Sequence, residues 1–211
     1  VVIPGLLWFY SASYKRMLIL GNLTVAFISA LVPLLVAMAN AEYLSYVYSE
    51  SLVYTPIIGT LYAWLGGFAL FSFLLTWARE IVKDVEDIEG DREMECRTIP
   101  IVWGENVTKI IVSVILFGVM SLITYLTWYV LPFPSEWSSL LFRFSVFGLL
   151  TPLACTIVLL WFARTTREYH TVQQVLKFVM FIGTMFGYVI YINLCVLYVV
   201  ENGNQSTIYL T

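Results

Sequence analysis

The sequence predicts an all-α membrane protein, a bundle of transmembrane helices with one concentrated polar segment. Of its 211 residues, 60% are hydrophobic and only 12% are charged, and the mean hydropathy is +0.85. A soluble domain with about half the usual share of charged residues has too little polar surface to face water. The apolar residues also form long blocks, which is the pattern of membrane spans. The net charge of −3 does not favour nucleic acid as a partner.

Five apolar blocks are each long enough to span a bilayer. About 20 residues cross a hydrocarbon core at a rise of about 1.5 Å per residue. In lipid these blocks must be helices, because their backbone groups have no water to bond with. The predicted spans are residues 17–39, 56–78, 110–131, 144–163 and 178–200. We interpret residues 1–211 as one integral membrane domain.

The first residues form an apolar run that ends at Lys15 and Arg16. A secretory signal would place basic residues before the apolar run. The chain also starts with Val1 rather than Met. We therefore interpret residues 1–14 as the end of a further membrane helix, so that the chain is a fragment with five full spans plus the end of one more.

The basic residues are distributed very unevenly between the two sides of the membrane. If the spans alternate in direction, Arg143 is the one residue among the 11 Lys and Arg that falls on the far side. The others precede residue 17 or lie in segments 79–109 and 164–177. The positive-inside rule then places the loop 79–109 in the cytoplasm. This predicts a protein of the inner or plasma membrane whose loop 79–109 is cytoplasmic.

Three smaller features fall inside or between the blocks. Pro33 and Pro152 predict kinks in their helices. Gly183 and Gly187 form a G-x-x-x-G pair, which is typical of close helix packing, with a role in a substrate site as the alternative. The single histidine, His170, lies in a polar turn and is not expected to be catalytic.

All three aspartates of the chain lie in the polar stretch 79–98, at positions Asp84, Asp87 and Asp91. This i, i+3, i+7 spacing predicts that the three carboxylates line one face of a helix that continues from the preceding span. Like charges at this spacing repel, so a bound cation would explain the stripe. The alternative is a solvated, mixed-charge loop of the kind common between membrane helices.

The chemistry of the stretch favours a hard cation. Neither the cysteines nor the histidine show a metal-binding spacing, so oxygen ligands and Mg²⁺, Mn²⁺ or Ca²⁺ are favoured over zinc or copper. Mg²⁺ takes one or two carboxylates and completes its shell with water and phosphate oxygens. Lys83, Arg92 and Arg97 supply donors for such phosphates. Metal and basic residues at the end of membrane helices suit a lipid with a phosphate or diphosphate head.

The run K-D-x-x-D-x-x-G-D from Lys83 to Asp91, followed by R-T-x-P from Arg97 to Pro100, resembles the second aspartate motif of the UbiA superfamily of membrane prenyltransferases. Its residue pattern is most similar to that of the branch that makes digeranylgeranylglyceryl phosphate. Homogentisate prenyltransferases and chlorophyll synthases carry a similar motif. The family fold is a bundle of nine membrane helices, of which this chain would hold the end of the fourth and all of the fifth to ninth.

The resemblance implies transfer of an isoprenyl group, geranylgeranyl in the first place, from its diphosphate to geranylgeranylglyceryl phosphate. An aromatic quinone or tocopherol-type precursor is the alternative acceptor. The resemblance also implies that Asp84, Asp87 and Asp91 hold Mg²⁺ against the diphosphate and that Lys83 binds its oxygens. The implied substrate-binding residues are Lys15, Arg16, Asn22, Arg79 and Arg97.

Elementary chemistry agrees with this reading. An allylic diphosphate ionises more easily when metal and cations stabilise the departing charge. The resulting carbocation needs a dry pocket with aromatic faces. The candidates for such faces lie on the span before the motif, and packing or contact with lipid is the alternative for each: Trp64, Phe68, Phe71, Phe73 and Trp77.

The chain departs from the family pattern in three places. The first aspartate motif of the family, N-D-x-x-D-x-x-x-D, has no match here, so this polypeptide by itself is expected to be inactive. Glu95 stands where the branch usually has Gly, which predicts a local change in the loop. Ser11 stands where the family often has Tyr.

Two other classes of protein were weighed. A transporter or channel usually carries ionisable groups within the membrane, and the five predicted spans contain none. A phosphatidyltransferase would need an acidic motif with D-G-x-x-A-R, which is absent from the sequence. The transporter therefore remains only a distant alternative.

Overall fold

The computed structural model of the chain describes residues 4–5, 8, 18–48, 56–130 and 140–208. Within these ranges the regular structure is helical and no strand occurs, which confirms the all-α prediction. Five segments are long and apolar enough to cross a membrane, so this is an integral membrane protein. The candidate spans are Leu20–Leu44, Leu61–Glu86, Glu105–Trp128, Leu140–Phe162 and Thr166–Ile192. The partial helix expected at 1–14 lies almost wholly outside the described residues.

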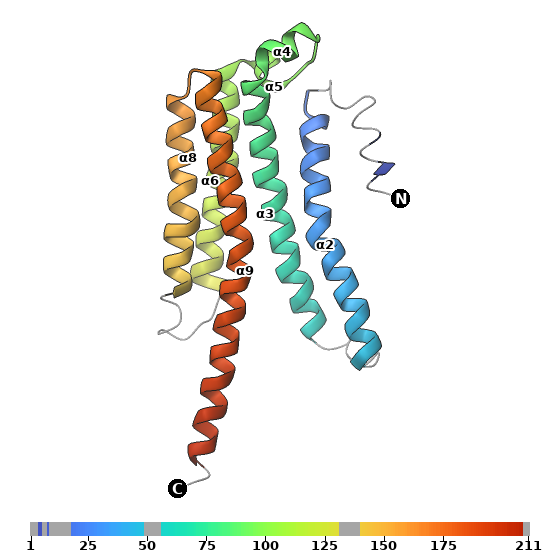
Figure 1. The fold of residues 1–211 in the computed structure, drawn as a ribbon, viewed down its shortest axis with the longest axis vertical. Helices are drawn as coiled ribbons and strands as arrows, with labels where there is room; N and C mark the ends of the chain where they lie inside the picture. The colour runs from blue at the N-terminus through green and yellow to red at the C-terminus, as the bar shows by residue number, and fades with distance from the viewer. Residues whose placement is uncertain (1–3, 6–7, 9–17, 49–55, 131–139, 209–211) are drawn as a thin grey trace.

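The helices follow one another with short connections. The elements are α2 (Leu20–Tyr48), α3 (Pro56–Glu86), α4 (Ile88–Glu93), α5 (Ile99–Trp103), α6 (Glu105–Tyr125), the π-helical turns η3 (Leu126–Val130) and η4 (Phe144–Leu150), α8 (Thr151–Phe162) and α9 (Thr166–Ile208). Residues 140–143 are helical and lead into η4 and α8. Figure 1 shows the long helices side by side, with α4 and α5 together at one end.

The helices extend well beyond the apolar blocks that the sequence marks. α3 continues through Arg79 and Lys83 to Glu86, and α9 begins at Thr166 rather than near residue 178. Apolar composition marks the part of a helix that lies in lipid. The helical hydrogen bonds continue into the polar ends, since a helix satisfies its backbone groups equally well in water.

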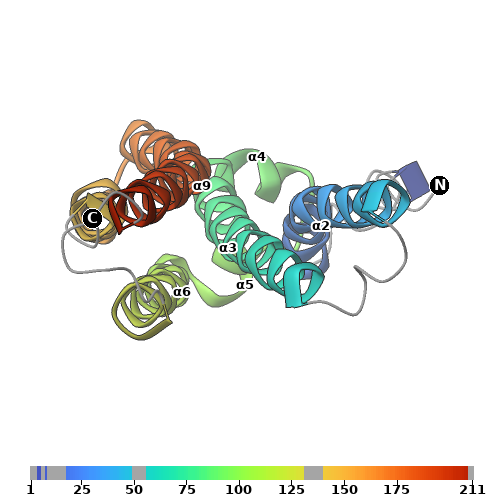
Figure 2. The same ribbon diagram turned by 90° about the horizontal axis from the view of Figure 1, so that it is seen from below.

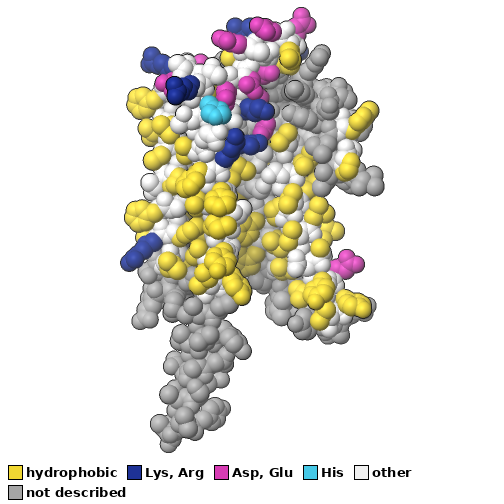
Figure 3. All heavy atoms as spheres, in the orientation of Figure 1, with side chains coloured by type: hydrophobic (Ala, Val, Ile, Leu, Met, Phe, Trp, Pro, Cys, Tyr) yellow, Lys and Arg dark blue, Asp and Glu magenta, His cyan; other side chains and the backbone are white. Residues whose placement is uncertain are grey.

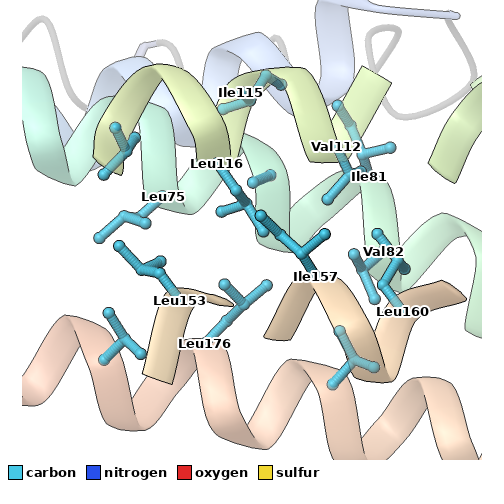
Figure 4. Packing of buried hydrophobic residues seen from close by; sticks show 14 of the residues in the cluster. Leu75, Ile81, Val82, Val112, Ile115, Leu116, Leu153, Ile157, Leu160 and Leu176 are labelled. Carbon is cyan, nitrogen blue, oxygen red and sulfur yellow. The ribbon is translucent and has the colours of Figure 1, made fainter. Parts of the chain in front are cut away.

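α3 is the central helix of the bundle. Figure 2 shows it between α2 on one side and α6 and α9 on the other, and Figure 1 shows α8 further out. The core between these helices is made of branched aliphatic side chains (Figure 4). Its members include Leu75, Ile81 and Val82 from α3, Val112, Ile115 and Leu116 from α6, Leu153, Ile157 and Leu160 from α8 and Leu176 from α9.

α2 packs against α3 in a different manner. The buried side chains of α2 are small, namely Ala26, Ala30, Ala37 and Ala41. Small residues let two membrane helices approach closely, and hydroxyl groups can then bond between them. Ser29 of α2 and Ser72 of α3 share a hydrogen bond of 2.6 Å, and the Thr76 hydroxyl donates to the Ser29 hydroxyl over 3.1 Å. This close contact holds the beginning of α2 beside the polar end of α3.

Candidate active site

Charged side chains gather at one end of the bundle. Figure 3 shows Lys, Arg, Asp, Glu and His concentrated over the end that α4 and α5 cover, and hydrophobic side chains over the surface below. We call this end, formed by residues 79–109 and 163–170, the charged end. The sequence motif therefore lies where polar helix ends leave the apolar part of the bundle.

Asp84 is the anchor of the candidate site. It lies in the last turn of α3, and Asn22 lies in the first turn of α2. The Asn22 side-chain amide Nδ2 donates a hydrogen bond of 2.7 Å to Asp84 Oδ2. Asp84 is half-buried, and the charges of Asp91, Glu80 and Lys83 act on it. The substrate-site role that the resemblance implied for Asn22 is not tested by this contact, but the contact places Asn22 beside the motif.

The helix that carries Asp84 is interrupted at Asp87, and Asp91 lies in the next helix, α4. α3 ends at Glu86 and α4 begins at Ile88, although the backbone N–H of Asp87 still bonds to the Lys83 carbonyl and that of Asp91 to the Asp87 carbonyl, each over 2.9 Å. Asp91 is half-buried like Asp84, whereas Asp87 is exposed. The expectation of one continuous helix carrying all three carboxylates is therefore corrected, because the helix is interrupted at Asp87.

The turn after α4 explains why related sequences usually have glycine at the position of Glu95. Cys96 N–H bonds to the Asp91 carbonyl over 2.9 Å, and Glu95 N–H bonds to the Arg92 carbonyl over 3.2 Å. These are the two bonds of a Schellman motif, in which the residue after the cap takes a left-handed conformation. Glu95 has φ 54°, a region where glycine is favoured. The turn ties the backbone of Asp91 to the chain that leads to Arg97.

The R-T-x-P segment starts the next helix. Thr98 has an extended backbone and precedes α5, and Pro100 stands in the first turn, where its missing N–H costs nothing. Thr98 is buried and Arg97 is exposed. The motif thus combines a structural turn with one basic side chain that faces water.

The donor set suits Mg²⁺. Among the residues that the structure describes, no three His, Cys, Asp or Glu side chains come together closely enough to hold a metal ion by themselves. Asp84 and Asp91 nevertheless act on each other electrostatically, and both are half-buried. Two carboxylates with water and phosphate oxygens are the usual protein ligands of Mg²⁺. A cation between them would offset the repulsion of two like charges that are partly shielded from water.

The basic residues differ in their surroundings. Lys83 is exposed and adjoins Asp84 in the chain. The Arg79 guanidinium is half-buried and bonds to the buried carboxylate of Glu80. Lys15 and Arg16 lie outside the described residues. The structure thus joins Asn22 to Asp84, with the charges of Asp91 and Lys83 acting on the same carboxylate, and leaves the substrate roles of Arg79 and Arg97 as predictions.

An apolar cavity of about 360 Å³ lies inside the bundle, below the charged end. Residues of α2, α3, α6, α8, α9 and both π-helical turns line it. Two of the five aromatic residues that were predicted as possible walls of a carbocation pocket, Phe68 and Phe71, line this cavity. Trp64 is exposed instead, and the rings of Phe73 and Trp77 lie 6.1 Å apart, outside the lining. The cavity suits a hydrocarbon chain, since its walls are almost wholly apolar.

Glu86, a charged residue of the polar stretch, is partly buried in the structure. Its side chain is half-buried and joins α3 to α9: Oε1 lies 2.9 Å from His170 Nδ1, and Oε2 accepts a hydrogen bond from the Gln173 amide. The partners lie more than eighty residues further along the chain, so no local sequence pattern could have identified them. Polar Gln173 on an otherwise apolar, buried helix face was the one available signal.

A second buried polar group lies at the start of α6. Lys109 Nζ donates to the Ala163 carbonyl over 2.6 Å and pairs with Glu105 over 2.9 Å, and the Tyr169 hydroxyl bonds to the same Glu105. The ammonium group also lies 5.4 Å from the centre of the Tyr169 ring. These contacts join α6 to the turn between α8 and α9, and they stabilise the charged end.

The site combines acidic and basic side chains at one end of the bundle with an apolar cavity between the helices. This combination suits an amphipathic molecule. The chain belongs to the UbiA prenyltransferase family, which matches residues 1–190. No solved structure matches the chain significantly.

Several curated proteins are similar to part of the chain. A digeranylgeranylglyceryl phosphate synthase of Thermococcus sibiricus is 37% identical over 106 residues, which is 50% of this chain and 31% of that protein. The protein of the same name from Pyrococcus furiosus is 34% identical over 118 residues, 56% of this chain and 35% of that protein. The one from Methanosphaera stadtmanae is 42% identical over 65 residues, 30% of this chain and 24% of that protein. The chain thus spans about a third or less of these relatives' length.

Proposed function

We propose that the protein containing this chain transfers an isoprenyl group from its diphosphate to a lipid acceptor. The geranylgeranyl group is the proposed donor chain and geranylgeranylglyceryl phosphate the proposed acceptor. The observation that carries the proposal is the position of Asp84. It is half-buried, hydrogen-bonded to Asn22, subject to the charge of Asp91, and located at the end of a bundle that contains an apolar cavity. The family and the names of the similar proteins support the same reaction.

In this proposal the diphosphate lies at the charged end and the isoprenyl chain enters the cavity. Asp84 and Asp91, with Asp87 from its exposed position, would hold Mg²⁺, which supplies positive charge to the departing diphosphate when it is bound. Lys83 binds diphosphate oxygens through charge-assisted hydrogen bonds. Asn22 orients the Asp84 carboxylate through its bond to Oδ2.

The cavity walls stabilise the allylic carbocation that ionisation leaves behind. The allylic C–O bond breaks, and its electron pair leaves with the diphosphate. The carbocation then bonds to the oxygen of the acceptor hydroxyl, and the hydroxyl proton passes to the departing diphosphate. Apolar walls keep water from the cation, and the ring face of Phe71 offers it electrostatic stabilisation.

The test is transfer by the native full-length protein in membranes, with the variants Asp84→Asn, Asp91→Asn and the exposed control Glu89→Gln. We expect each aspartate variant to lower the rate by about a hundredfold or more, since each removes a carboxylate that would hold Mg²⁺, the source of positive charge at the departing diphosphate. The control should retain the wild-type rate. Product mass, with geranylgeranylglyceryl phosphate and an aromatic acceptor both supplied, identifies the acceptor. Equal rates in Asp84→Asn and Glu89→Gln, or transfer that persists after chelation of divalent cations, would contradict the proposal.

We also propose that the charged end faces the cytoplasm. The support is the concentration of Lys and Arg in the segments that form it. The test is the variant Glu93→Cys in a background without the native cysteines, because position 93 is exposed at this end. An impermeant thiol reagent labels this cysteine only from the side of the membrane that it faces. Labelling only after the membranes are opened is the expected result for sealed spheroplasts, and labelling of intact spheroplasts would reverse the orientation.

A further inference from the structure

The apolar cavity extends along α3 away from the charged end. Along α3, its lining runs from Leu75 to Phe68. Phe68 lies about 24 Å from Asp84 along the helix axis, at a rise of about 1.5 Å per residue. The apolar core of a bilayer is about 30 Å thick. Phe68 is therefore the lining residue of α3 that is farthest from the charged end, deep in the far half of the span.

The Phe68 ring is seated against a glycine of α9. A β-carbon at Gly187 would lie 3.2 Å from Phe68 Cζ, closer than side chains normally pack, so the absence of a side chain at 187 lets the ring reach α9. One turn earlier, Gly183 lines the cavity, and a β-carbon there would meet nothing within 4 Å. The two glycines thus have different surroundings: Gly187 receives a ring, and Gly183 borders open space.

Both π-helical turns also line the cavity. Leu126 of η3 and Leu149 of η4 line the cavity, and the Thr127 hydroxyl of η3 donates to the Ser145 hydroxyl of η4 over 3.2 Å. Phe186 of α9, another lining residue, stacks on Phe144 of η4 with ring centres 5.9 Å apart. These contacts join η3 to η4 and η4 to α9 beside the cavity.

We propose that the contact between Phe68 and Gly187 closes the deep end of the cavity and so sets the longest isoprenyl chain that the protein accepts. This inference rests on the proposed function, since the cavity must hold the donor chain. A chain that ends before the Phe68 ring is fully buried. A chain longer by one isoprene unit meets the ring, and its last carbons lose the burial that favours binding.

The test is competition between donors in the native full-length protein, with farnesyl, geranylgeranyl and geranylfarnesyl diphosphate supplied together and the products separated by mass. Phe68→Ala removes the ring and lengthens the cavity. We expect it to raise the use of geranylfarnesyl relative to geranylgeranyl diphosphate by about tenfold or more, which is the effect of one or a few methylenes in an apolar pocket. Gly183→Val fills open space one turn nearer the charged end and should shift use toward the farnesyl donor.

Phe181→Ala is the matched control, because Phe181 lies on α9 with its ring exposed on the apolar surface. It should leave the donor ratio of the wild type. Unchanged ratios in both Phe68→Ala and Gly183→Val would overturn the inference, and if one variant does not fold the other decides. A wild-type protein that transfers no isoprenyl group from any donor would count against the proposed function itself.

Discussion

Asn22 and Asp84, which lie 62 residues apart in the chain, are joined by a hydrogen bond of 2.7 Å between the side chains of α2 and α3. The donor is the Asn22 amide and the acceptor is an Asp84 carboxyl oxygen, so the bond is charge-assisted when Asp84 is ionised, as it would be with a cation bound. The close packing of α2 on α3 through alanines and serines brings the two groups within reach. This bond connects the helix that precedes the motif to the motif itself.

Asn22→Ala should lower the rate of isoprenyl transfer roughly ten- to a hundredfold. A hydrogen bond to a charged group is worth about 1.5–3 kcal/mol, and each 1.36 kcal/mol is about tenfold in rate. The measurement is product formation by the native protein in membranes. Asn40→Ala is the control, because Asn40 lies at the other end of α2 and bonds only to the Val36 carbonyl of its own helix among the contacts described. Equal activity of the two variants would show that the bond does not position Asp84 for the reaction.

Glu95→Gly should stabilise the turn between α4 and α5 by about 1 kcal/mol, because a non-glycine residue in the left-handed region is strained by roughly that amount. Hydrogen–deuterium exchange of segment 88–104 should slow in this variant. Glu93→Gly places the same residue inside α4 and should have the opposite effect, since glycine destabilises helices. Faster exchange in Glu95→Gly would mean that the glutamate side chain contributes more than its backbone costs.

Lys109→Ala should destabilise the charged end by about 1–3 kcal/mol, since the Ala163 carbonyl and the Glu105 carboxylate lose their donor. The upper part of that range is less expected, because Glu105 is partly exposed to solvent. The measurement is the unfolding midpoint of the detergent-solubilised protein. Lys177→Ala, an exposed position on α9, should change stability by less than about 0.5 kcal/mol. Similar midpoints for the two variants would contradict a stabilising role for the buried ammonium group.

Glu86→Ala should loosen the contact between α3 and α9. The Gln173 side chain is buried, and the loss of its acceptor leaves an amide without this bond, at a cost of about 1–3 kcal/mol. Faster hydrogen exchange at the start of α9 is the expected observation. Glu89→Ala, at an exposed position of α4, is the control and should leave that exchange unchanged. The prediction fails if both variants exchange alike in segment 166–176.

Much of the fold followed from local pattern, because each membrane helix needs its own apolar stretch. The expected number of five spans agrees with the five candidate spans of the structure, and helix α3 continues past its predicted apolar block through polar residues such as Arg79 and Lys83. The departure at Glu95 was visible in the motif, and the left-handed backbone there gives it a physical meaning. Asp84, Asp87 and Asp91 remain the predicted ligands of Mg²⁺, and the break at Asp87 is the feature that helical spacing did not reveal.

The sequence by itself determined that this is a helical membrane protein with one mixed-charge polar segment. Apolar spans and charged segments are local features of the chain, so neighbouring residues are enough to predict them. Only the tertiary structure decided which side chains meet. It joined Asn22 to Asp84, turned Glu86 toward α9, and placed Phe68 against Gly187 at the end of a cavity. These contacts depend on how helices that are distant in the chain cross and pack, and a local pattern carries no information about that geometry.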